Sequence, residues 1–292
     1  MKIKKKREWL QQALFVFPGL LIFLTIVIVP FLMGFYYSFT KWDGIRYSPS
    51  WTGLSNFWML MEDTRFWHAF GYTIKFTVIA VVITNLMAFS FAVLLIQRLK
   101  MRNILRTIFF LPNVIGGLLL GYIWQFIFVK GFTTIGSKTH IAFFQEPWLG
   151  TPTTGFWGTI IVFIWQTTGY MMIVYIAALV SVPKDLQEAA RIDGAGAWQM
   201  LRSVTLPLVM PAVTICLFLT TSGAFKMFDL NLSLTNGGPG TSTESLALNI
   251  YREAFTNSNF GLGTMKAMMF FVAVAIVTVT QVLITKKREV QA

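Results

Sequence analysis

Long uncharged apolar stretches recur along this chain of 292 residues. A bilayer core about 30 Å thick requires roughly 20 apolar residues in a helix, so uncharged runs of at least about 18 residues are candidate spans. Six stretches qualify, and they cover residues 13–39, 76–96, 107–129, 155–182, 206–225 and 267–285. The pattern predicts an all-α, polytopic membrane protein with six transmembrane helices.

The composition agrees with a multi-pass protein of the cell membrane. Apolar residues make up 55% of the chain and charged residues only 12%, whereas a soluble domain carries about 25% charged residues. The first apolar run follows a basic segment, as a signal peptide does, but it exceeds the roughly 7–15 apolar residues of a signal peptide. We therefore expect it to be retained as a helix.

The distribution of Lys and Arg predicts the orientation of the spans, because cytoplasmic connections are enriched in these residues. The N-terminal tail, the second-to-third connection, the fourth-to-fifth connection and the C-terminal tail together hold fifteen of them, against six in the alternate segments. Both termini are thus predicted to be cytoplasmic. The formal charge of +12 is then explained by orientation and by anionic lipid, and we expect no nucleic-acid partner.

The spans and connections form a single membrane domain in this interpretation. It comprises a basic cytoplasmic tail (1–12), the first span (13–39), an outer loop (40–71), a core of five spans (72–285) and a second tail (286–292). The core includes a cytoplasmic loop at 183–206 and an outer loop at 229–263.

Catalytic and metal-binding constellations are missing from the pattern, so no enzyme and no metal site are predicted. His68 and His140 have no partner at metal-ligand spacing, and a single cysteine, Cys216, excludes an intrachain disulfide. The loop NGGPGTST at 236–243 lacks the lysine of a phosphate-binding Walker motif. The uncharged spans contain no acidic residue for ion coupling, so we expect the energy for any transport to come from another subunit.

The most informative segment is the cytoplasmic loop VPKDLQEAARIDGAGAWQMLRSVTLP at 182–207. Pro183 is expected to end the fourth span, Asp185 and Glu188 to form a capping box, and Gly194 to end the resulting short helix. Pro207 suits the first turn of the fifth span. From the residues alone, a solvated amphipathic connection and an interaction site are equally good interpretations.

The string EAARIDG at 188–194, followed after nine residues by Val-x-Leu-Pro at 204–207, resembles the EAA signature of membrane subunits of binding-protein-dependent ATP-binding-cassette (ABC) importers. The stretches PGLLIFLTIVIVPFLMGFYYSFTKWDG, GLSNF and LTNGGPGTSTESLALNIYREAF are similar to the maltose-transporter-like, carbohydrate-uptake branch. The match departs at Val204, where isoleucine is usual. The resemblance implies the type I importer permease fold (MetI-like), with both termini inside.

In that family the loop is a coupling helix that docks in a cleft of the ATPase subunit. The resemblance implies a contact set on this chain, with two residues as apolar anchors: Glu188, Ala189, Ala190, Asp193 and Gly194, with Leu186 and Ile192 as the anchors. It also implies partners: a second homologous permease, two ATP-binding subunits that hold ATP and Mg, and an extracytoplasmic sugar-binding protein. No cofactor is expected in this chain itself.

A sugar site needs hydrogen-bonding groups and an aromatic face. Helical spacing and the resemblance together indicate Gln166, Thr167 and Tyr170 on the fourth span and Thr220, Gly223, Ala224 and Met227 on the fifth. Helix packing explains each of these residues equally well. Lys226 and Asp229 form either a local ion pair, which we favour, or part of the substrate's access route.

The predicted function is therefore that of a permease subunit that forms half of the translocation path of an ATP-driven importer for a sugar, most simply an oligosaccharide. Two alternatives remain open: the same architecture importing another small solute such as glycerol phosphate, and an ion-coupled secondary transporter.

Overall fold

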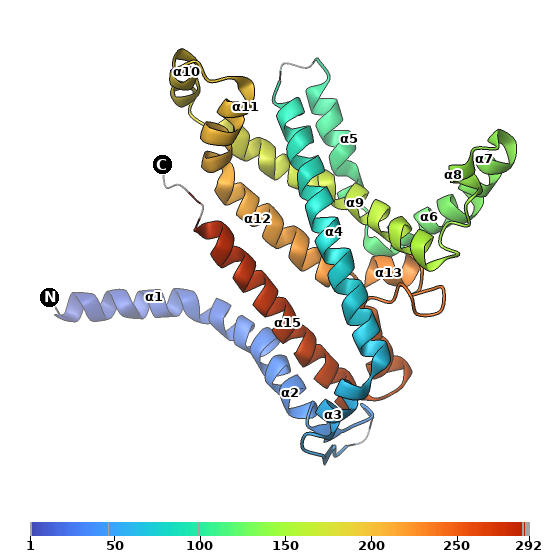
Figure 1. Cartoon of the computed structure of the whole chain (residues 1–292). Helices are drawn as coiled ribbons and strands as arrows, with labels where there is room; N and C mark the ends of the chain where they lie inside the picture. Colours follow the sequence, from blue (N-terminus) through green and yellow to red (C-terminus); the bar gives the residue numbers. More distant parts are fainter. Residues whose placement is uncertain (1, 46, 98–99, 288, 290–292) are drawn as a thin grey trace. The chain divides into compact units, whose positions relative to one another are not determined.

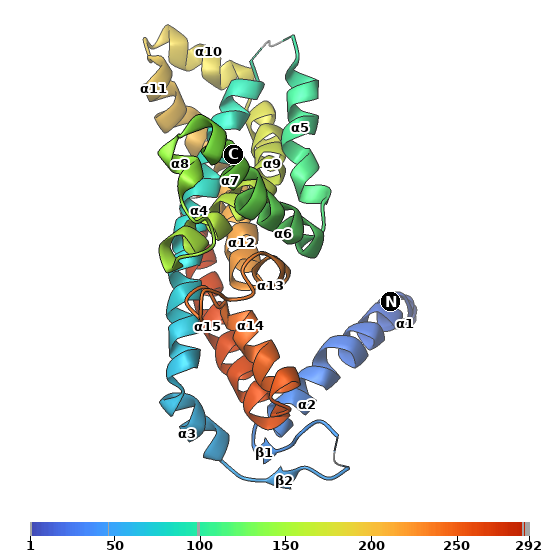
Figure 2. The same cartoon turned by 90° about the vertical axis from the view of Figure 1, so that its right-hand side faces the viewer.

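The computed structural model describes residues 2–45, 47–97, 100–287 and 289 and is predominantly helical (Figures 1 and 2). Within these residues six helical stretches are long and apolar enough to cross a membrane: Leu14–Tyr37, Thr64–Leu95, Gly117–Thr139, Pro152–Ser181, Ala197–Phe225 and Phe260–Lys286. The prediction of an all-α protein with six spans is confirmed, with a two-residue strand pair as the only sheet in the described part.

The chain divides into two compact units, which we describe separately. Unit 1 contains residues 1–63 and 250–270, and unit 2 contains residues 64–249 and 271–292. The elements of unit 1 are α1 (Lys2–Phe23), the π-helical turn η1 (Leu24–Ile28), α2 (Val29–Tyr37), β1 (Thr40–Lys41), β2 (Ser50–Trp51), α3 (Ser55–Glu62), η4 (Arg252–Thr256) and the first part of α15 (Phe260–Lys286). Strands β1 and β2 pair antiparallel, with Thr40 opposite Trp51.

Buried polar contacts hold the loops of unit 1 together. The Asn56 side-chain amide donates to the carbonyls of Ser38 and Thr40, each at 2.8 Å. A Cβ added to Gly261 would lie 2.0 Å from the Thr40 carbonyl oxygen, so only glycine allows α15 to approach β1 this closely.

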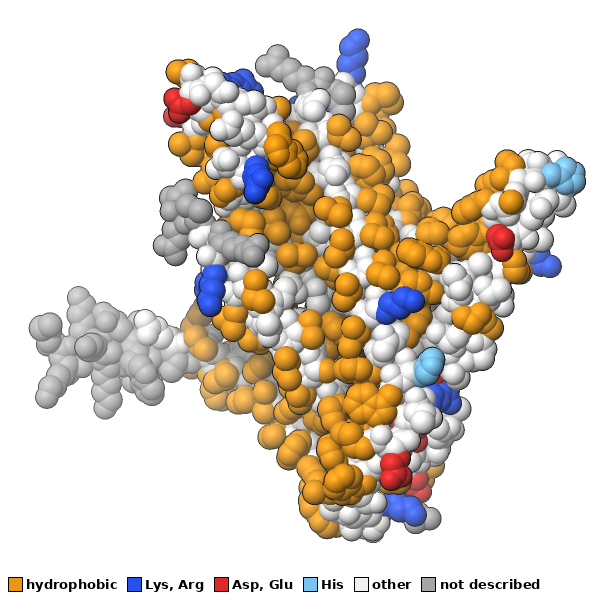
Figure 3. All heavy atoms as spheres, in the orientation of Figure 1, with side chains coloured by type: hydrophobic (Ala, Val, Ile, Leu, Met, Phe, Trp, Pro, Cys, Tyr) orange, Lys and Arg blue, Asp and Glu red, His pale blue; other side chains and the backbone are white. Residues whose placement is uncertain are grey.

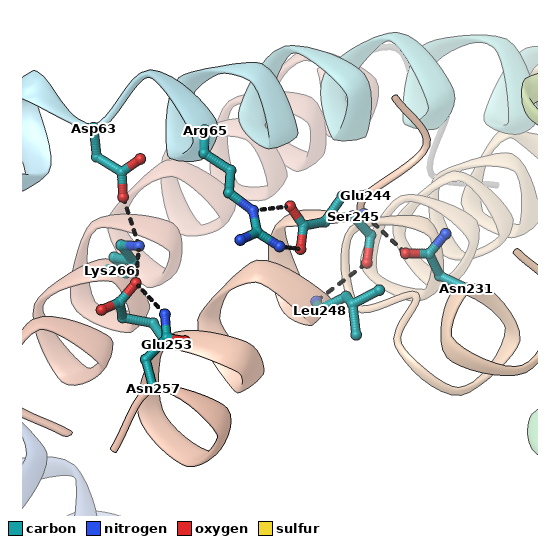
Figure 4. Close-up of polar contacts among 9 residues, drawn as sticks. All are labelled: Asp63, Arg65, Asn231, Glu244, Ser245, Leu248, Glu253, Asn257 and Lys266. Carbon is teal, nitrogen blue, oxygen red and sulfur yellow. Dashed lines mark hydrogen bonds and ion pairs between the residues drawn. The ribbon is translucent and has the colours of Figure 1, made fainter. Parts of the chain in front are cut away.

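A buried lysine anchors the start of α15 in the same unit. The Lys266 side chain is 1% exposed, and its Nζ lies 2.6 Å from Asp63 Oδ2 and 2.8 Å from Glu253 Oε2 (Figure 4). The sequence rule placed this lysine outside the sixth span because it rejected charged residues. Helix α15 instead begins at Phe260 and includes the lysine, because two carboxylates neutralise it.

Unit 2 contains the remaining elements: α4 (Thr64–Leu95), α5 (Arg102–Val114), α6 (Gly117–Phe126), η2 (Ile127–Gly131), α7 (Phe132–Thr139), α8 (Ala142–Gln145), α9 (Pro152–Ser181), α10 (Lys184–Ile192), α11 (Ala197–Met200), η3 (Leu201–Thr205), α12 (Leu206–Phe225) and α13 (Asp229–Leu234), together with the end of α15. Helix α14 (Leu246–Tyr251) crosses the division between the units. Helices α4, α9 and α12 pack on one another around two buried apolar clusters.

The third span differs from the prediction. Residues 107–129 were expected to form one helix, but α5 ends at Val114 and α6 begins at Gly117. Gly116 has extended backbone, and the Gln166 amide of α9 donates to the exposed Ile115 carbonyl at 3.1 Å. The helix breaks here because Gly116 and Gly117 have low helix propensity and a neighbouring amide replaces the lost backbone bond.

The second span also starts earlier than predicted, at Thr64 rather than residue 76. Arg65, which the sequence rule excluded, forms a bidentate pair with Glu244, at 2.7 and 2.8 Å (Figure 4). Glu244 directly follows the NGGPGTST loop, and polar groups of this segment are hydrogen-bonded within the chain. Asn231 donates to the Thr243 carbonyl and accepts from the Ser245 backbone amide.

The surface carries many exposed apolar side chains, which cover α4 and its neighbours in Figure 3. On α4, Val78, Val82 and Leu86 are 58%, 51% and 64% exposed. Soluble monomers rarely expose so large a continuous apolar surface. These faces suit lipid or other protein chains, as expected of a multi-pass membrane protein.

Candidate functional site: the cytoplasmic coupling loop and the helices behind it

The loop that carries the EAA string lies at one end of unit 2. Helix α10 lies at the same end as the C-terminus of α4 and the N-terminus of α5 in both views (Figures 1 and 2). These segments were assigned to the cytoplasmic side from their Lys and Arg content. Their common location agrees with that assignment, although the orientation across the membrane stays a prediction.

The start of α10 differs from the expected capping box. Helix α10 begins at Lys184 with Pro183 as its N-cap residue, and no side chain caps it. Asp185 lies in the first turn instead, where its charge is favourable toward the helix dipole. The prediction failed because Pro183 already supplies extended backbone, with ψ of 132°, so that the helix starts one residue before Asp185 can serve as the cap.

The end of α10 is as predicted. Gly194 has a φ of +81°, and its backbone amide donates to the Arg191 carbonyl at 3.1 Å. The Ala195 amide donates to the Ala190 carbonyl at 2.9 Å. This pair of bonds is a Schellman motif, which requires the left-handed backbone that glycine adopts without strain.

None of the residues of α10 is buried in this chain. Leu186 is 45% exposed and Ile192 is 87% exposed, although both are apolar. Leu186, Ala189, Ala190 and Asp193 share one helical face, while Glu188 and Ile192 share another. Five of the seven residues of the predicted contact set lie on α10, and Asp193 and Gly194 form its C-terminal end. Its own chain leaves this segment open, with Ala190 the only half-buried member of the set.

A continuous helical path connects this loop to the membrane. Gly196 starts α11, which runs through the π-helical turn η3 into α12. The Leu206 amide donates to the Leu201 carbonyl, five residues back. Pro207 follows in the first turn of α12, where its missing N–H is tolerated. A displacement of α10 can therefore be transmitted directly into the fifth span.

The predicted substrate residues of α9 have mixed environments. Tyr170 is exposed, and Gln166 and Thr167 are half-buried. The Gln166 side-chain amide donates to the Ile115 carbonyl, and the Thr167 hydroxyl donates to the Phe163 carbonyl. Tyr170 thus has the most accessible side chain of the three, and Gln166 also holds the break between α5 and α6.

The predicted stripe on α12 is not a single open face. Thr220, Ala224 and Met227 are buried, whereas Gly223 is exposed, with no other atom within 4 Å of an added Cβ. The Thr220 hydroxyl accepts from Asn85 at 2.9 Å and donates to the Cys216 carbonyl at 2.7 Å. The substrate role of these residues stays a prediction, and in this chain three of them contribute to its core.

The expected ion pair between Lys226 and Asp229 does not form among the described residues. Helix α12 ends with Lys226 as its C-cap, and Asp229 opens the separate helix α13. The two side chains therefore do not share the helical face that their spacing suggested. Both are exposed, and a role in substrate access stays a prediction.

A buried polar network was missed from the sequence. The Tyr175 hydroxyl donates to Asn85 Oδ1 at 2.7 Å, and Asn85 Nδ2 donates to Thr220. These bonds link α9, α4 and α12 inside the apolar core. The polar residues were visible in the spans, but their sequence separations of 90 and 135 residues gave no indication that they meet.

Among the described residues there is no group of three or more His, Cys, Asp or Glu side chains that could hold a metal ion. This region contains the exposed helix α10, the continuous helical path from α11 into α12, and the break between α5 and α6, where the Gln166 amide binds the Ile115 carbonyl.

Comparisons with known proteins found the following similarities. The family model described as "Binding-protein-dependent transport system inner membrane component" matches residues 85–290. The probable starch degradation products transport system permease protein AmyD of Thermoanaerobacterium thermosulfurigenes is 49% identical, over 95% of this chain and 94% of its own length. The multiple sugar-binding transport system permease protein MsmF of Streptococcus mutans is 33% identical, over 89% and 90%.

A similar fold occurs in the crystal structure of a bacterial ABC transporter involved in the import of the acidic polysaccharide alginate. The match has a TM-score of 0.82 at 22% identity and covers 98% of this chain and 99% of that chain. At this identity the likeness concerns the fold alone.

Proposed function

Because the chain belongs to the family of binding-protein-dependent transport system inner membrane components, we propose that it forms half of the translocation path of an ATP-driven importer for a sugar, most simply an oligosaccharide. As a member of this family it is a transport permease subunit of a multi-pass membrane complex and not an enzyme. The cargo and the identity of each partner are the proposed part.

The single observation that carries the proposal is the open coupling helix α10. Its apolar residues Leu186 and Ile192 are exposed in this chain, at 45% and 87%, and a partner surface would bury them. Burying apolar area provides about 25 cal/mol per Å². A helix seated in a groove is a recurring recognition mode. Because Leu186 and Ile192 lie on different faces, the partner's groove would have to enclose the end of α10 to bury both. We assign that groove to an ATP-binding subunit, with ATP and Mg bound there.

The transport step follows from the rigid connection between α10 and the spans. Closure of two ATP-binding subunits would move the coupling helices of two permeases together. Since α11, η3 and α12 are continuous, this motion would shift the fifth span as a body. The path between the two permeases would then open outward to receive the sugar from its binding protein, and hydrolysis would return it.

A sugar cargo is supported by the names of the relatives and by the exposed residues behind the loop. AmyD and MsmF are described as carriers of starch degradation products and of multiple sugars. Tyr170 of α9 offers an exposed aromatic ring, and Gly223 of α12 is exposed with free space around an added Cβ. Aromatic rings beside open, weakly polar surface suit carbohydrate.

The test is ATP hydrolysis by the complete complex in lipid vesicles, with binding protein loaded in turn with maltooligosaccharides, monosaccharides and glycerol phosphate. We expect stimulation by one loaded oligosaccharide, accompanied by its uptake. Stimulation by glycerol phosphate alone would replace the sugar with that solute. Uptake driven by an ion gradient without ATP would overturn the ABC mechanism and favour a secondary transporter.

A further inference from the structure

A hollow separate from the loop of α10 lies in unit 2, between the N-terminal parts of α4 and α9. Its volume is about 490 Å³. Trp67, Tyr72 and Lys75 of α4 line it, together with Phe156 and Trp157 of α9 and Ser242 of the outer loop. The hollow combines a cation, aromatic rings and hydroxyl groups at the ends of two spans that are predicted to face outward.

Lys75 carries a charge that the described residues do not neutralise. It lies eleven residues into the spanning helix α4, which places it about 16 Å from the start of that helix at 1.5 Å per residue. The side chain is exposed and forms no ion pair with the described residues. Its Nζ lies 4.8 Å from the centroid of the Phe156 ring. A cation on a spanning helix needs a counter-charge, because ionised side chains are costly there.

Tyr72 forms part of the aromatic wall of the hollow. It is 9% exposed, and its ring meets that of Phe156 edge to face, with 5.8 Å between the centroids. Its hydroxyl is enclosed by the protein, so a ligand in the hollow would meet the ring, and Lys75 would supply the charge.

An exposed apolar surface continues from the hollow along both helices. Val78 and Val82 follow on α4, and Ile161 and Trp165 follow on α9, all of them exposed. A second hollow of about 210 Å³, lined by Met87, Phe91 and Trp165 among others, lies further along the same helix pair. It begins eight residues beyond Ile79 and Trp157 of the first hollow, about 12 Å deeper along each helix.

We propose that the hollow binds the headgroup of an anionic phospholipid, with the phosphate at Lys75 and an acyl chain along the groove between α4 and α9. The charge calls for an anion, and the apolar continuation calls for a hydrocarbon chain attached to it. A soluble sugar would fill only the first hollow and would leave Lys75 without a counter-charge. An amphipathic anion satisfies both parts of the site.

The test is native mass spectrometry of the purified complete complex after incubation with phosphatidylglycerol or phosphatidylcholine. The variants are Lys75→Gln, Lys75→Arg and Lys130→Gln. Lys130 is a matched control, because it is an exposed lysine on the predicted outer part of the third span and lines neither hollow. Size-exclusion profiles establish that each variant assembles.

We expect wild type, Lys75→Arg and Lys130→Gln to retain phosphatidylglycerol, and Lys75→Gln to bind it at least about tenfold more weakly, because glutamine removes the charge-assisted hydrogen bond to the phosphate. Equal retention by Lys75→Gln and wild type would overturn the proposal. In wild type alone, equal retention of phosphatidylcholine, displacement by inorganic phosphate, or a retained oligosaccharide or protein would also overturn it. This lipid site does not depend on which solute the transporter carries.

Discussion

Replacing Gly194 separates the folding of the coupling helix from its docking on a partner. Gly194 has a φ of +81°, and no atom of this chain lies within 4 Å of an added Cβ. A side chain at this position therefore meets no steric obstacle within the subunit. It adds only the strain of a left-handed L-residue, about 1–2 kcal/mol, and Asn tolerates that conformation better than other residues.

Gly194→Asp and Gly194→Asn are nearly isosteric, so they differ mainly in charge. We expect Gly194→Asn to reduce coupled uptake by less than about tenfold, because its strain is below about 1.4 kcal/mol. Gly194→Asp adds an acid next to Asp193 and would carry an unpaired charge into a protein interface. That costs at least about 3 kcal/mol, or roughly a hundredfold in docking, and we expect it to abolish transport.

The assay measures three quantities for each variant: the amount of subunit in the membrane, the amount of ATPase that co-purifies, and sugar uptake. Membrane insertion should be unchanged in both variants, while the Asp variant loses ATPase and uptake. Normal uptake by Gly194→Asp would refute the assignment of α10 as the coupling helix. Equal loss in both variants would show that backbone strain decides the outcome and would refute the docking argument.

Three further substitutions test the packing. Lys266→Met leaves two half-buried carboxylates without their buried cation and should lower the free energy of unfolding by about 3 kcal/mol, the lower end of the range for a buried pair; an unchanged thermal midpoint in detergent would contradict the role of this ion triad. Gly169→Ala would place Cβ 1.8 Å from the Phe109 carbonyl oxygen, so α5 must move, and loss of assembled complex on size exclusion is the expected result. Tyr175→Phe removes the donor to Asn85 and should cost about 0.6–1.7 kcal/mol; chemical denaturation that shows no change would mean that the network contributes nothing.

The number of spans and the coupling loop could be predicted because both depend on local sequence. Apolar run length sets whether a helix can cross a bilayer, and Pro183 and Gly194 define the start and the end of a short helix. The residues of the substrate path were less predictable. Helical spacing grouped Thr220 with Gly223, but which face of α12 is buried depends on α4 and α9.

The sequence by itself determined the all-α membrane architecture, the family resemblance and the position of α10, since each follows from residues that are close together in the chain. Only the tertiary structure decided where charge is admitted into a helix. Lys266 and Arg65 lie in spanning helices because Asp63, Glu253 and Glu244 neutralise them, and the Ile115 carbonyl at the helix break is satisfied by Gln166. A rule that reads one segment at a time cannot detect such compensation, because the neutralising group comes from another part of the chain.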